Sequence, residues 1–330
     1  MTAPNDGASE RESGGRRAAG VACWAIGVTL ALLLGSCTPA AGPTTHASAG
    51  PAETPTPSAQ QPSAAPALPV LYTDLDGTLL DEDSRIPAEN LAALERYRRA
   101  GGKVGVATGR LPESALPFAL AIGANVPLVF ANGAIVTTAT GELIDMKGLS
   151  ENEEVQAVCD LMSRGRCAHV HAAFGDPKTG EVELLDGRCE PSPRDDQLVL
   201  KMRARLCQDH AQLVEQLVQS ARGRYSVVES GQGEYFGVSV AALGVSKGQA
   251  LGAIANRLGL GLAGLAFVGD SGNDVSAAHA VHQAGGTCFA MPNGTAELLA
   301  ACPQHTSRDN AHGGVAEVAE LLLARARAPQ

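Results

Sequence analysis

From residue 69 onwards, short apolar runs alternate with longer amphipathic stretches. The apolar runs are nearly continuous, which is typical of strands buried on both faces of a parallel sheet. They cover Val70–Thr73, Val104–Thr108, Pro127–Phe130 and Leu265–Val268. Stretches with helical periodicity cover Pro87–Ala100, Ser114–Ile122, Lys247–Leu258 and Val315–Ala326. Strands that alternate with helices in this way predict an α/β fold, a doubly wound parallel sheet with helices on both faces.

The pattern changes in the middle of the chain. Helical periodicity near Glu151–Arg164 and His210–Ala221 is mixed with the strand-like segments AHVHAAF, EVELLDG, RYSVVE and EYFGVSV. This mixture predicts a compact α+β domain over residues 137–240, inserted into a core formed by residues 69–136 and 241–330.

The N-terminal residues do not fit this core. Residues 1–36 contain Arg16 and Arg17 followed by an uncharged apolar run, which predicts an export signal. Leu34-Gly35-Ser36-Cys37 resembles a bacterial lipobox, with cleavage before Cys37 and lipid on its sulfur. The apolar run is also long enough for an uncleaved membrane-spanning helix. Residues 37–68, rich in Pro, Ala, Thr and Ser, are expected to form a disordered linker. Both readings predict a membrane-anchored protein on the periplasmic or extracytoplasmic face.

Charge and cysteine content add two constraints. The net charge of −10 argues against nucleic acid as a partner, because phosphate backbones require clustered Lys and Arg. A small anionic substrate stays possible, since a bound metal inverts the local field. Six cysteines remain beyond Cys37, and their even number in each domain is compatible with disulfides in an oxidising compartment or with free thiols. They are Cys159, Cys167, Cys189 and Cys207 in the insertion, and Cys288 and Cys302 in the core.

Polar groups follow three of the predicted strands. Asp74 and Asp76 follow the first, the turn Thr108-Gly109-Arg110 ends the second, and Gly269-Asp270 follows Leu265–Val268. Ligands of parallel sheets bind beyond the carboxyl ends of the strands, so these groups are expected to meet at one edge. By itself, the Asp-x-Asp-Gly pattern is also typical of a surface turn or a calcium loop.

Four segments in order extend this picture: LYTDLDGTLLDED, VATGR, GVSKGQAL and VGDSGNDVSAA. They resemble the four motifs of the haloacid dehalogenase (HAD) superfamily. The long α+β insertion between the second and third motifs resembles its Cof-type subclass IIB, a branch related to sucrose-phosphate and mannosyl-phosphoglycerate phosphatases. The resemblance covers roughly residues 69–330 and implies a phosphatase with a Rossmann-like core and a mobile cap.

The resemblance also implies catalytic roles. Asp74 would be the nucleophile that forms an aspartyl-phosphate, and Asp76 the general acid and later the general base. Thr108 would donate a hydroxyl hydrogen bond and Gly109 a backbone N–H to the phosphate oxygens. Lys247 would neutralise the phosphoryl group and Asp74. Arg110 would either contact substrate or pair with a neighbouring residue.

A metal ion follows from the same resemblance. Closely spaced carboxylates repel a phosphate and each other, so a cation is expected among them. Mg²⁺ would be held by Asp74, the backbone carbonyl of Asp76 and Asp270, while Asp274 orients a metal-bound water. Asn273 would help to hold the cluster. Asp270 and Asp274 could instead be helix N-caps.

The resemblance implies a small phosphorylated metabolite as the substrate, with a sugar phosphate as the first candidate. Export of the protein favours a role in scavenging phosphate esters over a role in sugar metabolism. A phosphomutase and a lipoprotein that only binds phosphorylated ligands are the alternatives. Asp81, Glu82 and Asp83 are interpreted as solvated flap residues. His169 and His171 alternate on an expected strand of the insertion, and without a third ligand in view they are interpreted as satisfied or exposed histidines rather than as a metal site. The arginines of the insertion are scattered and form no recognisable cluster: Arg164, Arg166, Arg188, Arg194, Arg203 and Arg205.

Overall fold

A computed structural model describes residues 67–150, 152–167, 169–186, 196–205, 207, 210–230 and 237–328. The predicted export signal and nearly all of the predicted linker lie outside these residues. In this part of the chain, no helix is both long enough and apolar enough to cross a bilayer.

The central sheet is parallel and has five strands in the order β13-β12-β11-β1-β2. The strands are β1 (Val70–Thr73), β2 (Lys103–Val106), β11 (Leu265–Gly269), β12 (Thr287–Ala290) and β13 (Gln304–His305). β1 lies between β11 and β2, with Thr73 opposite both Val106 and Val268. The strand order reverses here, which opens a crevice at the carboxyl ends of β1 and β11.

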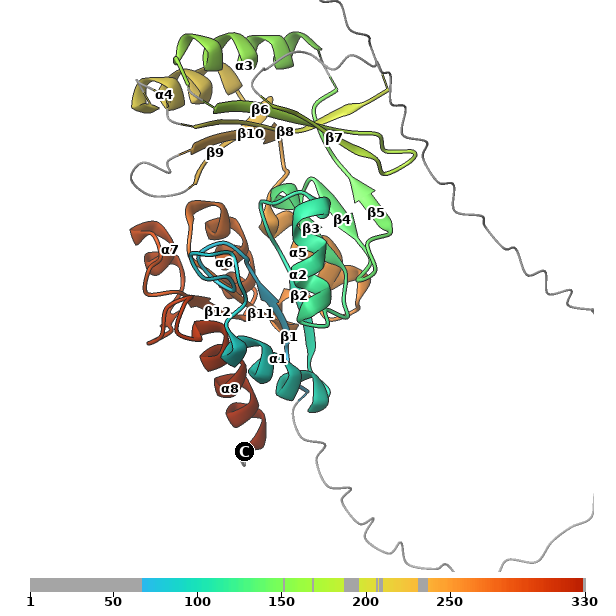
Figure 1. Cartoon of the computed structure of the whole chain (residues 1–330), viewed down its shortest axis with the longest axis vertical. Helices are drawn as coiled ribbons and strands as arrows, with labels where there is room; N and C mark the ends of the chain where they lie inside the picture. Colours follow the sequence, from blue (N-terminus) through green and yellow to red (C-terminus); the bar gives the residue numbers. More distant parts are fainter. Residues whose placement is uncertain are drawn as a thin grey trace, which may run out of the picture. The chain divides into compact units, whose positions relative to one another are not determined.

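Helices cover both faces of this sheet (Figure 1). They are α1 (Ala88–Arg99), α2 (Pro112–Ala121), α5 (Lys247–Arg257), α6 (Val275–Gln283), α7 (Ala296–Ala301) and α8 (Gly314–Arg327). The side chains of successive residues of β1 point to opposite faces of the sheet. Leu71 packs with α1, α2 and α8, whereas Val70 and Tyr72 pack with α5 and α6. The predicted doubly wound core is therefore confirmed.

A small antiparallel sheet continues the core beyond β2. Its strands are β3 (Leu128–Phe130), β4 (Ile135–Thr137) and β5 (Leu143–Met146), in that order. A parallel bridge between Ala107 and Val129 joins it to the end of β2. The insertion was expected to begin at residue 137. In the structure this residue is the last of β4, which pairs with β3 on one side and with β5 on the other.

The inserted domain, here called the cap, is an antiparallel sheet with two helices on one face (Figure 1). The strand order is β7-β6-β8-β10-β9. The elements are α3 (Asn152–Arg164), β6 (His169–Gly175), β7 (Val182–Asp186), β8 (Leu198–Arg205), α4 (His210–Ala221), β9 (Tyr225–Ser230) and β10 (Gly237–Ala242). β8, a central strand of the cap sheet, was not predicted. Its segment LVLKMRAR carries three cations among its apolar residues.

Disulfides occur in both domains, and Cys189 lies outside the described residues. Cys288 and Cys302 are bonded in the core and Cys167 and Cys207 in the cap, and Cys159 is also disulfide-bonded. On the loop-entropy model, closing the Cys288–Cys302 loop stabilises the fold by about 3 kcal/mol.

Candidate active site

Three residues that the sequence analysis singled out lie just beyond the carboxyl ends of three neighbouring strands. Asp74 follows β1, and its N–H donates to Val268 O of β11 at 3.0 Å. Thr108 follows β2, and its N–H donates to Val129 O at 2.9 Å. Asp270 follows β11 directly. These backbone hydrogen bonds hold the polar side chains at one edge of a rigid sheet.

Lys247 lies in a fully buried position between two carboxylates. Its Nζ donates to Asp74 Oδ1 at 2.8 Å and to Asp274 Oδ1 at 2.6 Å. Ser246 caps α5 by accepting a hydrogen bond from Gln249 N, which places Lys247 in the first turn of the helix. A Cβ at Gly248 would lie 2.3 Å from Ser276 O, so glycine lets α5 approach α6 closely enough for this contact.

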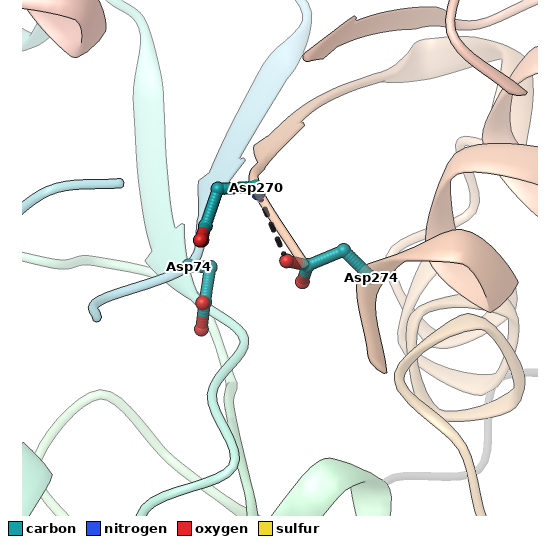
Figure 2. Close-up of side chains that lie close together, drawn as sticks. All are labelled: Asp74, Asp270 and Asp274. Atoms are coloured by element: carbon teal, nitrogen blue, oxygen red, sulfur yellow. Dashed lines mark hydrogen bonds between the residues drawn. The ribbon is translucent and has the colours of Figure 1, made fainter. Parts of the chain in front are cut away.

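Three aspartates converge at this point, as Figure 2 shows. One carboxylate oxygen from each of Asp74, Asp270 and Asp274 lies within 4.8 Å of the other two. Neighbouring oxygens around an octahedral Mg²⁺ are about 3.0 Å apart and opposite ones about 4.2 Å, so these side chains lie close enough to share one ion after a modest rearrangement. Carboxylate oxygens are also the donors that Mg²⁺ prefers. The residues present therefore fit a divalent cation.

The carboxylate of Asp274 already has several partners. Oδ2 accepts the N–H groups of Asp270 and Ser271, each at 3.0 Å, and Oδ1 accepts Lys247. Together with Ser271 it forms a capping box at η4 (Gly272–Asp274). Asp274 is therefore the third residue of the capping box and not the N-cap that the alternative reading expected, since the N-cap is Ser271, and the same side chain also fixes Lys247.

Burial makes this cluster electrostatically strained. Burial raises the pKa of Asp74 to about 7 against the opposing charge of Lys247, and the charge of Asp274 adds to the rise. The pKa of Asp270 is also well above its ordinary value, for the same two reasons. Burial would lower the pKa of Lys247, but Asp274 and Asp74 outweigh it and raise the pKa. Three carboxylates against one ammonium leave an excess of negative charge for a cation to neutralise.

This cluster predicts an unusual pH dependence of stability. In the unfolded chain Asp74 titrates near 3.8, and in the folded metal-free protein near 7. The folded state therefore binds more protons between these values, so the free energy of unfolding should fall as pH rises from about 4 to about 7. Thermal denaturation in EDTA at pH 5 and pH 8 measures this, and Mg²⁺ should restore stability at pH 8. The Asp74→Asn variant should show a smaller pH effect, and an equal effect in both proteins contradicts the assignment.

Asp76 lies apart from the three converging carboxylates. Its side chain is 60% exposed and accepts two hydrogen bonds from the guanidinium of Arg110, one of them at 2.8 Å from Nε. Burial would raise the pKa of Asp76, but the hydrogen bonds and charge of Arg110 hold it below the ordinary value. Of the two roles considered for Arg110, the structure shows pairing with a neighbour. The metal contact expected of Asp76 involves its backbone carbonyl and stays a prediction.

The predicted phosphate-binding turn lies against two asparagines. Thr108 is buried, and its Oγ1 accepts the N–H of Arg110 at 3.1 Å. Asn273 donates from Nδ2 to Asn132 Oδ1 at 3.0 Å and accepts Ser271 Oγ at 2.6 Å. A Cβ on Gly109 would lie 2.9 Å from Asn132 Oδ1, so the turn and both asparagines are packed closely.

Gly77 gives a test of the geometry around Asp270. Its φ is +75°, and an added Cβ would lie 2.4 Å from Asp270 Oδ2. Gly77→Ala should therefore displace that carboxylate, and a shift of about 1 Å at a catalytic site costs about a hundredfold in kcat/KM. Gly101→Ala is the matched control, because Gly101 has φ +88° but no atom within 4 Å of the added Cβ. Both variants should lose about 1–2 kcal/mol of stability. Equal activities of the two variants would show that Asp270 has no role in turnover.

The sequence interpretation missed three contributors to this edge. Asn132 adopts φ 58°, a left-handed conformation that Asn tolerates. The Asn-Gly pair at 132–133 is the sequence feature that could have indicated a turn here. Thr78 donates from Oγ1 to Asp270 Oδ1 at 2.8 Å. Lys201, on β8 of the cap, donates from Nζ to Gly109 O at 3.1 Å. The sequence signal for Lys201 was the alternation of Lys201, Arg203 and Arg205 with apolar residues, which is typical of a strand.

Comparison with known families agrees with this geometry. The model of the haloacid dehalogenase-like hydrolase family matches residues 71–176 and 189–318. The chain therefore belongs to this family, and it is an enzyme of the hydrolase class that acts on phosphate esters. The resemblance drawn from the four motifs is confirmed.

Individual relatives are distant but are matched over nearly their whole length. The chain is 25% identical over 292 residues to phosphatase YwpJ of Bacillus subtilis (strain 168), covering 77% of this chain and 99% of that protein. It is 26% identical over 284 residues to 5-amino-6-(5-phospho-D-ribitylamino)uracil phosphatase YwtE of the same strain, covering 76% and 96%. The solved structure of BT4131, a HAD subclass IIB sugar phosphatase, has a TM-score of 0.58 at 20% identity, covering 78% and 98%. That structural likeness shows a shared fold, a Rossmann-like core with a cap.

Proposed function

We propose that this protein is a Mg²⁺-dependent phosphatase that hydrolyses a small phosphate monoester of the sugar-phosphate class through an aspartyl-phosphate. The observation that carries the proposal is the buried contact of Lys247 with both Asp74 and Asp274, beside the oxygens of Asp270. The sugar phosphatase BT4131 and the phosphoribityl ester in the name of YwtE support the substrate class.

In the first step, a carboxylate oxygen of Asp74 attacks phosphorus and the bond from phosphorus to the ester oxygen breaks. Lys247 neutralises the incoming phosphoryl oxygens, and the hydroxyl of Thr108 and the N–H of Gly109 donate to them. The leaving oxygen takes a proton from Asp76. In the second step, water attacks the aspartyl-phosphate while Asp76 accepts its proton, which releases phosphate and regenerates Asp74.

Asp74, Asp270 and the backbone carbonyl of Asp76 would hold the Mg²⁺, with Asp274 beside them. The ion would supply charge neutralisation between the carboxylates and the phosphoryl group. Arg110 favours the ionised form of Asp76, so their hydrogen bonds must open before Asp76 can carry a proton.

Phosphate release by the purified full-length protein tests the proposal. We expect turnover of sugar phosphates with Mg²⁺, loss of turnover in EDTA, and recovery when Mg²⁺ is added back. An isomerised sugar phosphate in place of free phosphate would identify a phosphomutase. Absence of turnover from a folded, Mg²⁺-binding protein on every ester tried would leave only a binding protein.

We also propose that the protein is exported and held at the membrane by lipid on Cys37. The disulfides of the core and the cap support an oxidising compartment, because such bonds are rare in the cytosol. Labelling of cells with a radioactive fatty acid should mark the wild-type protein but not the Cys37→Ala variant. Equal labelling of both proteins rules out this anchor.

A further inference from the structure

One face of the cap sheet carries a row of cations. Along β8, Met202 and Ala204 pack into the cluster formed with α3 and α4. Lys201, Arg203 and Arg205 alternate with them and therefore extend from the opposite face of the sheet. Lys201 establishes where this face points, because its Nζ lies 3.1 Å from Gly109 O, next to the phosphate-binding turn.

A bulge in β8 directs Lys201 to that side. The register with β6 shifts between Ala173 and Phe174, which lie opposite Lys201 and Val199. Val199 packs with the helices of the cap, whereas Leu200 belongs to the cluster that continues into the core. The extra residue lets Leu200 and Lys201 both face the core, since a bulge interrupts the alternation of side chains.

The arginines of this row lack partners for buried donors. The Nε–H groups of Arg203 and Arg205 are buried and find no acceptor among the described residues, and the Oγ of Ser239 is also buried with no hydrogen-bond partner there. Ser239 lies directly opposite Arg203 in the pairing of β8 with β10. A buried donor without an acceptor costs free energy that a bound ligand can recover.

The positive charges are poorly compensated. Burial and the neighbouring cations Arg203, Lys247 and Arg205 lower the pKa of Lys201 to about 7. Burial and Arg205 lower the pKa of Arg203 to about 10, opposed by Asp76. Asp76 is already hydrogen-bonded to Arg110. Such a site disfavours further positive charge and attracts an anion.

We propose that Lys201, Arg203 and Arg205 bind a second anionic group of the substrate, a phosphate or a carboxylate remote from the reacting phosphoryl group. The inference rests on the proposed function, because the first phosphoryl group must occupy the site at Asp74. The guanidinium groups offer planar, paired donors that match phosphate and carboxylate oxygens. A sugar with only hydroxyl groups at its far end supplies no charge to balance three cations. The substrate class is therefore a sugar bisphosphate or a phosphorylated sugar acid.

Matched substrates test this inference in the full-length protein. Glucose 6-phosphate has a neutral far end, fructose 1,6-bisphosphate adds a phosphate, and 6-phosphogluconate adds a carboxylate. We expect wild-type kcat/KM to be higher for a doubly anionic substrate by about tenfold or more, the effect of one charge-assisted contact pair. The Arg203→Gln/Arg205→Gln variant should lose that preference, and Arg203→Lys/Arg205→Lys should keep part of it. Arg164→Gln, an exposed arginine on α3, is the matched control and should keep the full preference.

Binding to the Asp74→Asn protein gives a second readout that needs no turnover. Calorimetry should show tighter binding of a doubly anionic substrate than of glucose 6-phosphate, and Arg203→Gln/Arg205→Gln in that background should remove the difference. A preference for the bisphosphate or for the sugar acid identifies the second anion. Turnover with equal kcat/KM for all three esters, or a preference that survives the double substitution, overturns the second-anion site and leaves the phosphatase intact. Absence of turnover on every ester, with no anion-dependent binding, overturns both.

Discussion

Replacement of Asp74 by Asn should abolish phosphate release and leave the protein folded. The amide cannot attack phosphorus, so kcat should fall by at least about 10⁴, as for other nucleophiles that act as part of a unit. Asn retains an oxygen that can accept the hydrogen bond from Lys247 Nζ. It also removes a buried negative charge whose pKa burial raises to about 7, so the metal-free variant should be no less stable than wild type near neutral pH.

Acid quenching of the wild-type protein with a labelled substrate should trap phosphate on Asp74. Asp83→Asn is the matched control, because the Asp83 side chain is 69% exposed and forms an ion pair with Arg85, away from the three converging carboxylates. That variant should retain normal turnover and trapping. Substantial turnover of Asp74→Asn would exclude Asp74 as the nucleophile.

Replacement of Lys247 by Met should both inactivate and destabilise the protein. The substitution leaves two buried carboxylates, those of Asp74 and Asp274, without their shared ammonium. Breaking a buried ion pair by removing one partner costs about 3–5 kcal/mol. Urea denaturation in EDTA at pH 7 measures this loss. Lys103→Met, at the exposed start of β2, is the control and should change stability little.

A double-mutant cycle identifies the source of that cost. If it arises from an uncompensated carboxylate at Asp74, Lys247→Met should cost less in the Asp74→Asn background than in the wild type. Equal costs in both backgrounds would mean that the loss comes from the pairing with Asp274 or from packing of the lysine stem, and not from the pairing with Asp74.

The parts of the fold that could be predicted from sequence have strong local signals. β1 matches its predicted bounds, and α5 differs from its prediction only at the C-terminal end, within the ordinary spread of helix boundaries. β1 is apolar throughout because both of its faces are buried. Ser246 marks the start of α5 at Lys247 in the sequence, because Ser is a preferred N-cap residue.

β8 was missed because, unlike β1, it is not a continuous run of apolar residues. Only one of its faces packs on helices, and of the apolar residues there, Val199, Met202 and Ala204, only Val199 is a strong strand former. The bulge at Leu200 also breaks the alternation that would have marked the strand. Arg203 and Arg205 therefore read as two of the scattered arginines of the insertion rather than as one side of a strand with Lys201.

Side-chain partners at the site also could not be read from the sequence. Asp76 and Arg110 are separated by a strand, a helix and two turns, and only the parallel pairing of β1 with β2 brings the two strand ends together. The pairing of Cys167 with Cys207 had the same difficulty, because four cysteines in one domain allow three connectivities.

The position of β1 between β2 and β11 also determines when the enzyme can become active during synthesis. Val70 pairs with Lys103 on one side but with Leu265 on the other, so one edge of β1 has no partner until the ribosome has made most of the chain. Contacts between residues so far apart in sequence form slowly, since a long loop must close first. Lys247 and Asp270 follow the cap in the sequence, so a nascent chain that carries Asp74 has neither the ammonium nor the carboxylate beside it. Asp74 is therefore synthesised early, but its partners in the site are synthesised late, and the site can form only in the last stage of folding.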